Sequence, residues 1–315
     1  MIAPAHAAAD PCDAPLSTCV PSDNLWPYVG GGRWLSQSPT QTAAELSASF
    51  GFQLGYIHRP IAFRVQSPNV DGTDIYAVEH ALSATVMTAV GVTERLQVQL
   101  EAPFVLYQEG ASIADVIGSD VFLPRAAVGD FRFGVTGSIL RRPVKQDGPG
   151  LSARFEMSAP TGHKEAYVSG PSAAYAPGVS FDYEINRFAF GIDVGARVRH
   201  STQIANVLIA SQISAALGAG VDVLDDGWLS INAEAFALFT LLRGTEEQLV
   251  EGETRDRALP PHMPAEWLLS VRTAGALGGR LRASLGAGSF IPLTTPLPVT
   301  TPLVRAVAAI HYLHD

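Results

Sequence analysis

The chain has 315 residues, of which 47% are hydrophobic and only 16% are charged. This composition excludes a disordered chain, because disorder requires low hydrophobicity and high charge. The net charge is −9, and Lys145 and Lys164 are the only lysines, so the sequence offers no basic surface for a nucleic-acid backbone. The mean hydropathy of +0.17 is high for a soluble protein. A membrane location must therefore be considered.

The first residues predict export from the cytoplasm. The segment MIAPAHAAAD ends in the small residues of a signal-peptide tail, but it lacks the charged start and the apolar core of a complete signal. An ordinary alanine-rich terminus is the alternative. Cys12 and Cys19 are the only cysteines, and beside a secretory signal an even count favours a disulfide between them. No histidine or second cysteine pair stands at ligand spacing, so we expect no metal site.

From about residue 42 onward, apolar and polar residues alternate in segment after segment, which is typical of half-buried strands. In 151–159, leucine, alanine, phenylalanine and methionine occupy the odd positions, and serine, arginine and glutamate the even ones. No stretch resembles a membrane-spanning helix, because the best charge-free window, 200–221, contains seven polar residues. The expected strands are twelve, at residues 42–58, 75–90, 95–107, 130–141, 149–160, 173–184, 187–199, 207–223, 228–240, 263–274, 279–290 and 302–313.

The expected connections alternate in length along the chain. The tight ones, rich in turn residues, lie at 90–95, 185–187, 224–227 and 276–280. The long, polar ones lie at 58–74, 108–129, 161–171 and 242–262. Short turns on one rim and long loops on the other are typical of outer-membrane barrels. The sequence therefore predicts, over 42–315, an all-β, closed transmembrane antiparallel up-and-down β-barrel of about 12 strands in the bacterial outer membrane.

Residues 1–41 do not follow this period. We interpret them as the remnant of a secretory signal followed by a periplasmic leader. The stretch NLWPYVGGGRWLSQS, at 24–38, carries Trp26, Tyr28 and Trp34 around three glycines. It is either a cap or plug that lies against the barrel mouth or a flexible leader whose aromatic rings rest at the membrane interface. The flexible leader is the interpretation that we favour from the sequence.

Several short motifs are similar to the hairpins and turns of a known group of barrels. The motifs are Phe50–Tyr56 followed by Arg59-Pro60-Ile61, Glu79-His80, Gly91–Leu96, Leu100–Gly110, Gly129–Gly134 and Ser158–Gly162. They resemble the barrel portion of OmpA-type, porin-like proteins and related outer-membrane transporter barrels. The resemblance covers most of 42–313 and concerns barrel turns, so it implies the fold more than the function. Relatives of the OmpA type often continue into a peptidoglycan-binding domain, whereas this sequence stops at Asp315, so cell-wall anchoring is not carried over.

If the apolar strand faces meet lipid, the alternate faces line the interior. Charges are tolerated there, whereas an arginine or lysine at mid-bilayer on the lipid side costs about 2–4 kcal/mol. Both signs occur, so the interior is either a polar, weakly selective solute path or a salt-bridged lumen that only stabilises the barrel. The lumen-lining candidates are Glu79, Glu101, Arg132, Arg154, Glu156, Asp182, Asp193, Arg197, Glu234, Arg272 and Arg282. Further inward positions are Glu45, Asp222, Glu266 and Arg305.

An enzyme is the competing class, because some twelve-stranded barrels hydrolyse lipids. The only pair that needs testing is His200-Ser201, and adjacent residues on a strand point to opposite faces, which is poor geometry for a dyad. We therefore assign no catalytic residue. We interpret His80, on an otherwise apolar face, as an interfacial or packing histidine rather than a ligand. The acidic loop 245–257 could attract divalent cations near lipopolysaccharide, but a solvated loop is the simpler interpretation.

The sequence thus predicts a passive porin-like channel for small solutes or a structural outer-membrane protein, with an outer-membrane lipid hydrolase as the alternative. A soluble all-β binding protein is disfavoured by the apolar band and the loop asymmetry. The expected partners are outer-membrane lipids and lipopolysaccharide, without nucleic acid or cofactor. Twelve strands lie between eight-stranded barrels filled by side chains and sixteen-stranded aqueous porins, so we expect a small conductance.

Overall fold

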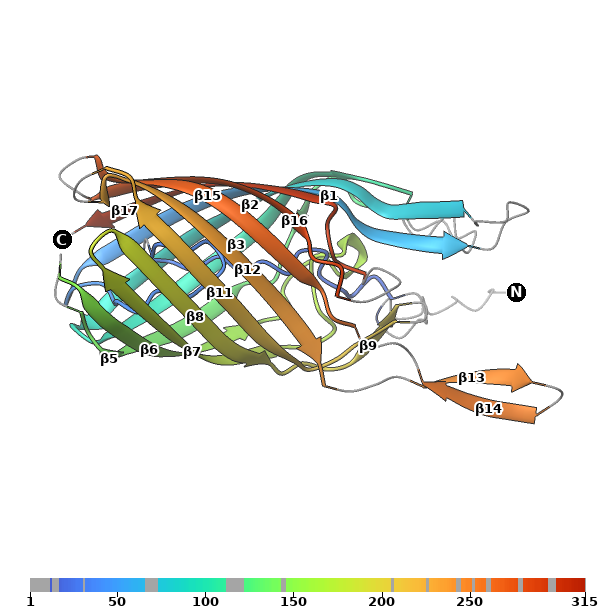
Figure 1. Ribbon diagram of the computed structural model, residues 1–315. Coiled ribbons are helices and arrows are strands. Elements are labelled where there is room, and N and C mark those ends of the chain that lie inside the picture. Colours follow the sequence, from blue (N-terminus) through green and yellow to red (C-terminus); the bar gives the residue numbers. More distant parts are fainter. Residues whose placement is uncertain are drawn as a thin grey trace, which may run out of the picture.

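The computed structural model (Figure 1) describes most of the chain. The described residues are Cys12 and 17–30, 32–65, 73–111, 122–142, 146–204, 207–224, 227–241, 245–250, 253–258, 262–276, 280–293 and 299–314. Nearly all of the regular structure is strand. No helix in the described part of the chain is long and apolar enough to span a membrane.

A barrel of 12 antiparallel strands forms the body of the molecule, as the alternation predicts. The strands are β1 (Ala48–Val65), β2 (Thr73–Thr93), β3 (Leu96–Glu109), β5 (Arg132–Leu140), β6 (Gly148–Ser158), β7 (Ala174–Ile185), β8 (Phe188–Arg197), β11 (Gln212–Asp222), β12 (Leu229–Thr240), β15 (Ala265–Ala276), β16 (Leu281–Phe290) and β17 (Val304–His314). The barrel closes where β1 pairs with β17, from Ala48 opposite His314 to His58 opposite Val304. Each strand therefore has two hydrogen-bonded neighbours.

Five smaller strands and one short helix complete the described elements. These are β4 (Ala127–Val128), the hairpin β9 (Thr202–Ile204) with β10 (Val207–Ile209), the hairpin β13 (Thr245–Val250) with β14 (Glu253–Ala258), and the 3-10 helix η1 (Lys164–Ala166). The β13–β14 hairpin and the ends of β1 and β2 project from the same end of the barrel (Figure 1). We call this the long-loop end and the opposite one, where β2 turns into β3, the short-turn end.

Burial alternates along the strands with the period of two that the sequence shows. On the outer face, Phe155 and Ile192 are 51% and 46% exposed, although both are large and apolar. Their chain neighbours Glu156 and Asp193 are buried in the interior. Apolar side chains outside and charged side chains inside are the reverse of a water-soluble protein, and they are what a barrel surrounded by lipid requires.

The expected strands differ from the observed ones mainly in three places. The connection expected at 58–74 is largely strand, because β1 continues to Val65 and β2 starts at Thr73. The first strand begins at Ala48 rather than at residue 42, because Leu46 takes a positive φ of 56° and the chain turns there. The eighth expected strand, 207–223, is two elements: Val207–Ile209 pairs with β9 in a hairpin, and the wall strand β11 starts at Gln212. Apolar runs alone could not separate a hairpin arm from the strand that follows it.

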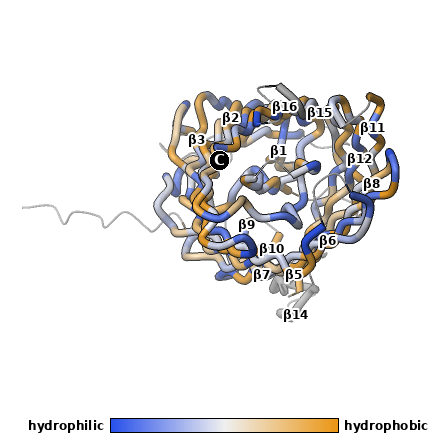
Figure 2. Tube along the Cα trace, turned by 90° about the vertical axis from the view of Figure 1, so that its left-hand side faces the viewer, coloured by the Kyte–Doolittle hydropathy of each residue, from blue (hydrophilic) through white to orange (hydrophobic). Residues whose placement is uncertain are grey.

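Most of the described chain before β1 lies inside the barrel, and Figure 2, a view along the barrel, shows chain segments within the ring of strands. We call residues 17–30 and 32–47 the leader. At the long-loop end the Ser17 amide donates to the Gln203 carbonyl. At the short-turn end Ala43 donates to the Gln97 side chain at 2.9 Å. The leader therefore runs through the whole length of the lumen, which differs from the flexible leader favoured from the sequence.

Candidate functional site: the lumen and its leader

The structure places most of the predicted lumen residues in the interior. Those that are buried are Glu101, Arg132, Arg154, Glu156, Asp193, Arg197, Glu234 and Arg272. Asp182 and Arg282 are partly buried on the same inner face. Glu79 differs, because its side chain is 35% exposed and pairs with Arg59 near the long-loop end. Glu45 is exposed just before β1 and does not face the lumen.

Buried arginines pair with carboxylates on other strands of the wall, either the next strand or the one beyond it. Arg132 Nη2 lies 2.6 Å from Glu101 Oε2, across the β3–β5 pair. Arg154 donates to both carboxylate oxygens of Asp193, at 2.5 and 2.8 Å. Both pairs are nearly excluded from solvent, so removal of one partner would leave a buried charge uncompensated. The inner wall is therefore a set of fixed, paired charges rather than a smooth polar surface.

The partner of Glu156 is not an arginine. Its Oε1 accepts a hydrogen bond of 2.6 Å from the Gln99 amide. Asp182 is paired near the short-turn end, where the Arg142 guanidinium donates to it at 2.8 Å. The sequence pattern identified the inward positions, but it could not assign partners, since that requires the register of neighbouring strands.

Wall carboxylates also hold the leader. Glu234 accepts two backbone N–H groups, from Leu35 at 2.9 Å and Ser36 at 2.8 Å. Near the short-turn end, Arg33 of the leader lies 2.8 Å from Asp222. The two bonds to Glu234 satisfy backbone N–H groups that would otherwise be buried without partners. The leader is consequently fixed to several strands along its length.

Two wall arginines enclose the Trp26 ring of the leader. The Arg197 guanidinium carbon lies 4.3 Å from the ring centroid, and that of Arg132 lies 4.9 Å away. A third such contact places Arg154 5.1 Å from the Tyr28 ring. Cation–π contacts of desolvated arginines are worth about 2 kcal/mol or more. The leader's aromatic side chains thus stabilise the wall arginines and are held by them.

Three cavities surround Trp26, which lines all of them. Their volumes are about 110, 40 and 20 Å³. Arg132 lines the largest, whereas Arg197 lines the two smaller ones. A cavity needs only about 10–15 Å³ to hold a water molecule, so each can be hydrated. Trp26 therefore separates water-sized spaces that would otherwise adjoin.

Glycines on the wall make room for the second indole of the leader. A Cβ atom added to Gly191 on β8 would lie 2.6 Å from the Trp34 ring, and one added to Gly218 on β11 would lie 2.8 Å from it. Gly191 and Gly218 are opposite each other in the β8–β11 pair. Side chains at these two positions would fill the space that Trp34 occupies.

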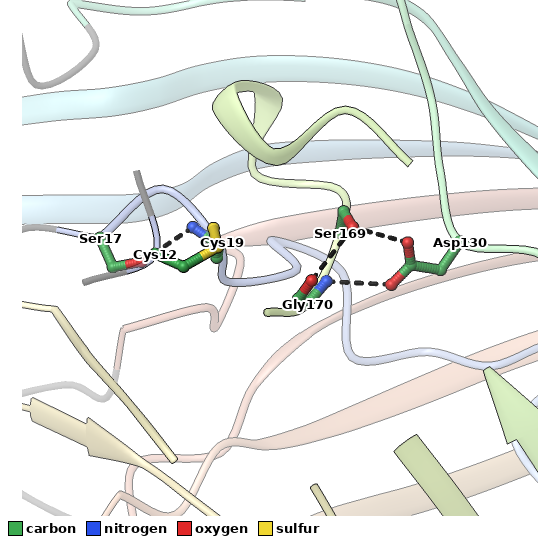
Figure 3. The surroundings of a disulfide bond; sticks show 6 residues. All are labelled: Cys12, Ser17, Cys19, Asp130, Ser169 and Gly170. Carbon is green, nitrogen blue, oxygen red and sulfur yellow. Dashed lines mark hydrogen bonds between the residues drawn. A yellow bond between two sulfur atoms is a disulfide. The ribbon is translucent and has the colours of Figure 1, made fainter. Parts of the chain in front are cut away.

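The leader is also fixed at the long-loop end. Cys12 and Cys19 form a disulfide, and Ser17 Oγ accepts a hydrogen bond from the Cys19 amide (Figure 3). In the same region, the Asp130 carboxylate accepts hydrogen bonds from Ser169 and Gly170 and so holds the connection before β7 (Figure 3). The disulfide closes a small loop at the start of the leader, and the Ser22 amide, which donates to the Tyr167 carbonyl at 2.8 Å, joins the leader to this end of the barrel.

The other candidates from the sequence are not brought into a catalytic arrangement. His200 and Ser201 are exposed on the connection after β8. The backbone of the acidic loop 245–257 forms much of the β13–β14 hairpin, but its side chains lie outside the described residues.

Sequence reasoning considered a cap or plug at 24–38 but favoured a flexible leader, although a signal for a filled lumen was present. Several inward positions of the wall strands are glycines, including Gly286, where an added Cβ would lie 2.9 Å from the Leu35 side chain of the leader. Glycine inside a strand marks a close approach of another group. Inward glycines on neighbouring strands therefore indicate that something else fills the lumen.

Comparison with known proteins supports the fold at the level of structure. No protein-family model and no curated protein matches the chain. The COG4313 outer-membrane channel from Pseudomonas putida F1 is similar with a TM-score of 0.58 and 10% sequence identity, over 87% of this chain and 97% of that one. The NanC porin gives a TM-score of 0.48 and 8% identity, over 84% and 99% of the two chains. The P. putida toluene transporter TodX gives 0.42 and 10%, over 86% and 91%.

The similarity to the COG4313 channel shows that this chain has the fold of an outer-membrane β-barrel. The predicted barrel class is thus confirmed, whereas the resemblance to OmpA-type proteins in particular gains no support.

Proposed function

We propose that this protein is a narrow outer-membrane channel for small solutes that is constricted by its own leader at Trp26. The observation that carries the proposal is the position of Trp26 between Arg132 and Arg197, with a cavity on either side. The COG4313 protein from P. putida F1, whose structure is similar, is an outer-membrane channel. This supports the same class of function for the present chain.

The lining of the lumen favours weak selectivity. Positive and negative side chains are paired, so no single sign of charge dominates the path. Small hydrated solutes fit the cavity sizes better than large ones. A purely structural barrel remains the second candidate, because the leader fills much of the lumen. Nothing in the structure or in the comparisons supports a lipid hydrolase.

The outer face and the loop asymmetry support an orientation in the membrane. The apolar outward side chains would contact outer-membrane lipids, and the long-loop end, with the β13–β14 hairpin, would face lipopolysaccharide and the cell exterior. Protease added to intact cells should then cleave within 242–262 and spare the 90–95 turn. Cleavage of the turn alone would show the opposite orientation.

Conductance in planar bilayers tests the channel directly. We expect a small conductance for the wild type and a several-fold larger one for Trp26→Ala, because loss of the indole joins the cavities. Trp267→Ala is the matched control, since Trp267 lies on the outer face with 45% exposure, and its conductance should equal that of the wild type. If neither the wild type nor Trp26→Ala conducts, the channel is refuted and the structural role is favoured.

A further inference from the structure

A second cluster of polar side chains lies on the outer face of the barrel, away from the lumen. His58 on β1 is directly opposite His80 on β2 in the strand register. The Nδ1 atoms of the two imidazoles are 3.2 Å apart, and the Tyr56 hydroxyl oxygen is 2.7 Å from His80 Nδ1. Three potential metal-ligand atoms thus converge on one point.

The distance between the two nitrogens suits a metal ion. Zinc binds imidazole nitrogen at about 2.0–2.1 Å, so two nitrogens 3.2 Å apart would subtend about 100° at the metal, close to the tetrahedral value. The imidazole rings are stacked, with centroids 4.7 Å apart and an interplanar angle of 26°. Because the Nδ1–Nδ1 distance is shorter than the distance between the centroids, the two rings face each other with their Nδ1 edges. The Tyr56 oxygen is near enough to be a third ligand, with solvent in the remaining position.

A carboxylate stands behind one of the histidines. Glu109 Oε1 lies 3.9 Å from His80 Nε2, and the Tyr107 hydroxyl donates to the other Glu109 oxygen at 2.5 Å. Histidines that bind metals commonly direct their second ring nitrogen to a carboxylate, which fixes the tautomer. At 3.9 Å Glu109 is close to Nε2 without being hydrogen-bonded to it, and a proton on Nε2 would leave the lone pair of His80 Nδ1 for the ion.

The cluster is reachable from solvent at the long-loop end, since the His80 side chain is 32% exposed. No group of three or more His, Cys, Asp or Glu side chains within the described ranges is arranged to hold a metal. This cluster instead combines two imidazoles with a phenol. Imidazole suits Zn²⁺, Cu²⁺ and Ni²⁺ better than it suits Ca²⁺ or Mg²⁺.

We propose that His58, His80 and Tyr56 bind one divalent transition-metal ion, with Zn²⁺ as the probe. The site joins β1 to β2 just before the register of the pair shifts, between His58 and Ile61. A bound ion would therefore fix the outward continuation of these strands to the barrel wall. This inference is independent of the proposed channel, because none of its residues faces the lumen.

Calorimetric titration of the untagged, refolded protein in detergent with ZnCl₂ tests the site. We expect one Zn²⁺ per barrel for the wild type and a loss of affinity of about 100-fold or more for His58→Ala and for His80→Ala. His200→Ala is the matched control, because His200 is exposed on a different connection, and its affinity should be unchanged. A wild type that binds no Zn²⁺ at millimolar concentration, or unchanged affinity in both variants, would overturn the proposal.

Cobalt gives a second readout that does not depend on stability. Co²⁺ bound by two imidazoles should give visible absorption bands that His80→Gln abolishes and Tyr56→Phe shifts. Each variant is first checked for the heat-dependent gel mobility of a folded barrel. If His80→Gln folds and keeps the cobalt spectrum of the wild type, His80 is not a ligand and the site is refuted.

Discussion

Arg305 of the last barrel strand and Asp23 of the leader form an ion pair, with Nη1 2.8 Å from Oδ1. The same guanidinium donates from Nε to Glu266 at 2.6 Å, so the arginine keeps a carboxylate when Asp23 is removed. Asp23→Ala should therefore loosen the leader and leave the wall intact. A loss of about 1 kcal/mol corresponds to about a 5-fold rise in the population with a displaced leader.

Current fluctuations of single channels measure that population. Open events should be more frequent in Asp23→Ala than in the wild type, with the same folded fraction on gels. As a control, Glu94→Ala removes a carboxylate that is 73% exposed and pairs with Arg141, and it should leave the fluctuations unchanged. If the single-channel current traces of the wild type, Asp23→Ala and Glu94→Ala are identical, the Asp23–Arg305 ion pair does not hold the leader in place.

Gly218→Val should displace Trp34, because an added Cβ already lies 2.8 Å from the indole ring. Overpacking of this kind costs about 1–3 kcal/mol, and we expect a lower unfolding midpoint in urea together with a higher conductance. Gly137→Val is the control, since an added Cβ there has no neighbour closer than 3.8 Å. The prediction fails if the two valine variants unfold at the same urea concentration.

Ile192→Arg should impair membrane assembly, because Ile192 lies on the outer face near the middle of β8. The cost at the midplane is about 2–4 kcal/mol and falls to about 0–1 kcal/mol at the interface. The same change at Val223, just after β11 and 42% exposed, is the control and should be tolerated. Folded yield in lipid vesicles measures both, and equal yields would contradict the lipid-facing assignment.

His262 predicts a dependence of stability on acid pH. It lies on the connection before β15, where burial, with Arg199 nearby, lowers its pKa to about 3. The unfolded chain takes up a proton near pH 6.5 and the folded chain does not, so stability is lost as the pH falls from about 6.5 toward 3. Between pH 7 and 5 the expected loss is about 2 kcal/mol.

Urea unfolding of the wild type and of His262→Gln at pH 7 and pH 5 measures this loss. Glutamine does not titrate, so the difference between the two pH values should be about 2 kcal/mol smaller in the variant. Equal differences in the two proteins would mean that His262 is protonated in the folded state as well.

The barrel could be predicted from the sequence because a period of two is a local signal that repeats in every strand. Phe155 beside Glu156 already fixes which face each belongs to. The partners of the charged residues could not be predicted in the same way. Arg154 binds Asp193, which lies two strands away, and only the register of β6, β7 and β8 brings the two together. His58 and His80 are neighbours for the same reason.

The position of the leader inside the barrel could not be predicted, because its apolar and polar residues do not alternate with a regular period. Its polar side chains and backbone groups bond to the wall at irregular intervals, as Asn24 does to Thr300 at 2.6 Å. Trp26 and Trp34 were visible as aromatic residues, but a sequence does not show whether an indole lies at a membrane interface or between two arginines. The inward glycines were the available signal, and it can be interpreted only once the inner face of each strand is known.

The path of the leader restricts the order in which the molecule can assemble. Its Ser17 and Ala43 contacts lie at opposite ends of a ring that the β1–β17 pair closes. Threading after closure would require two indoles and a disulfide loop to pass through a lumen with cavities of at most about 110 Å³ around Trp26. Closure around a leader already in position requires no such passage. We therefore expect the β1–β17 strand pair to form last, after the inner faces of the other strands have packed against the leader.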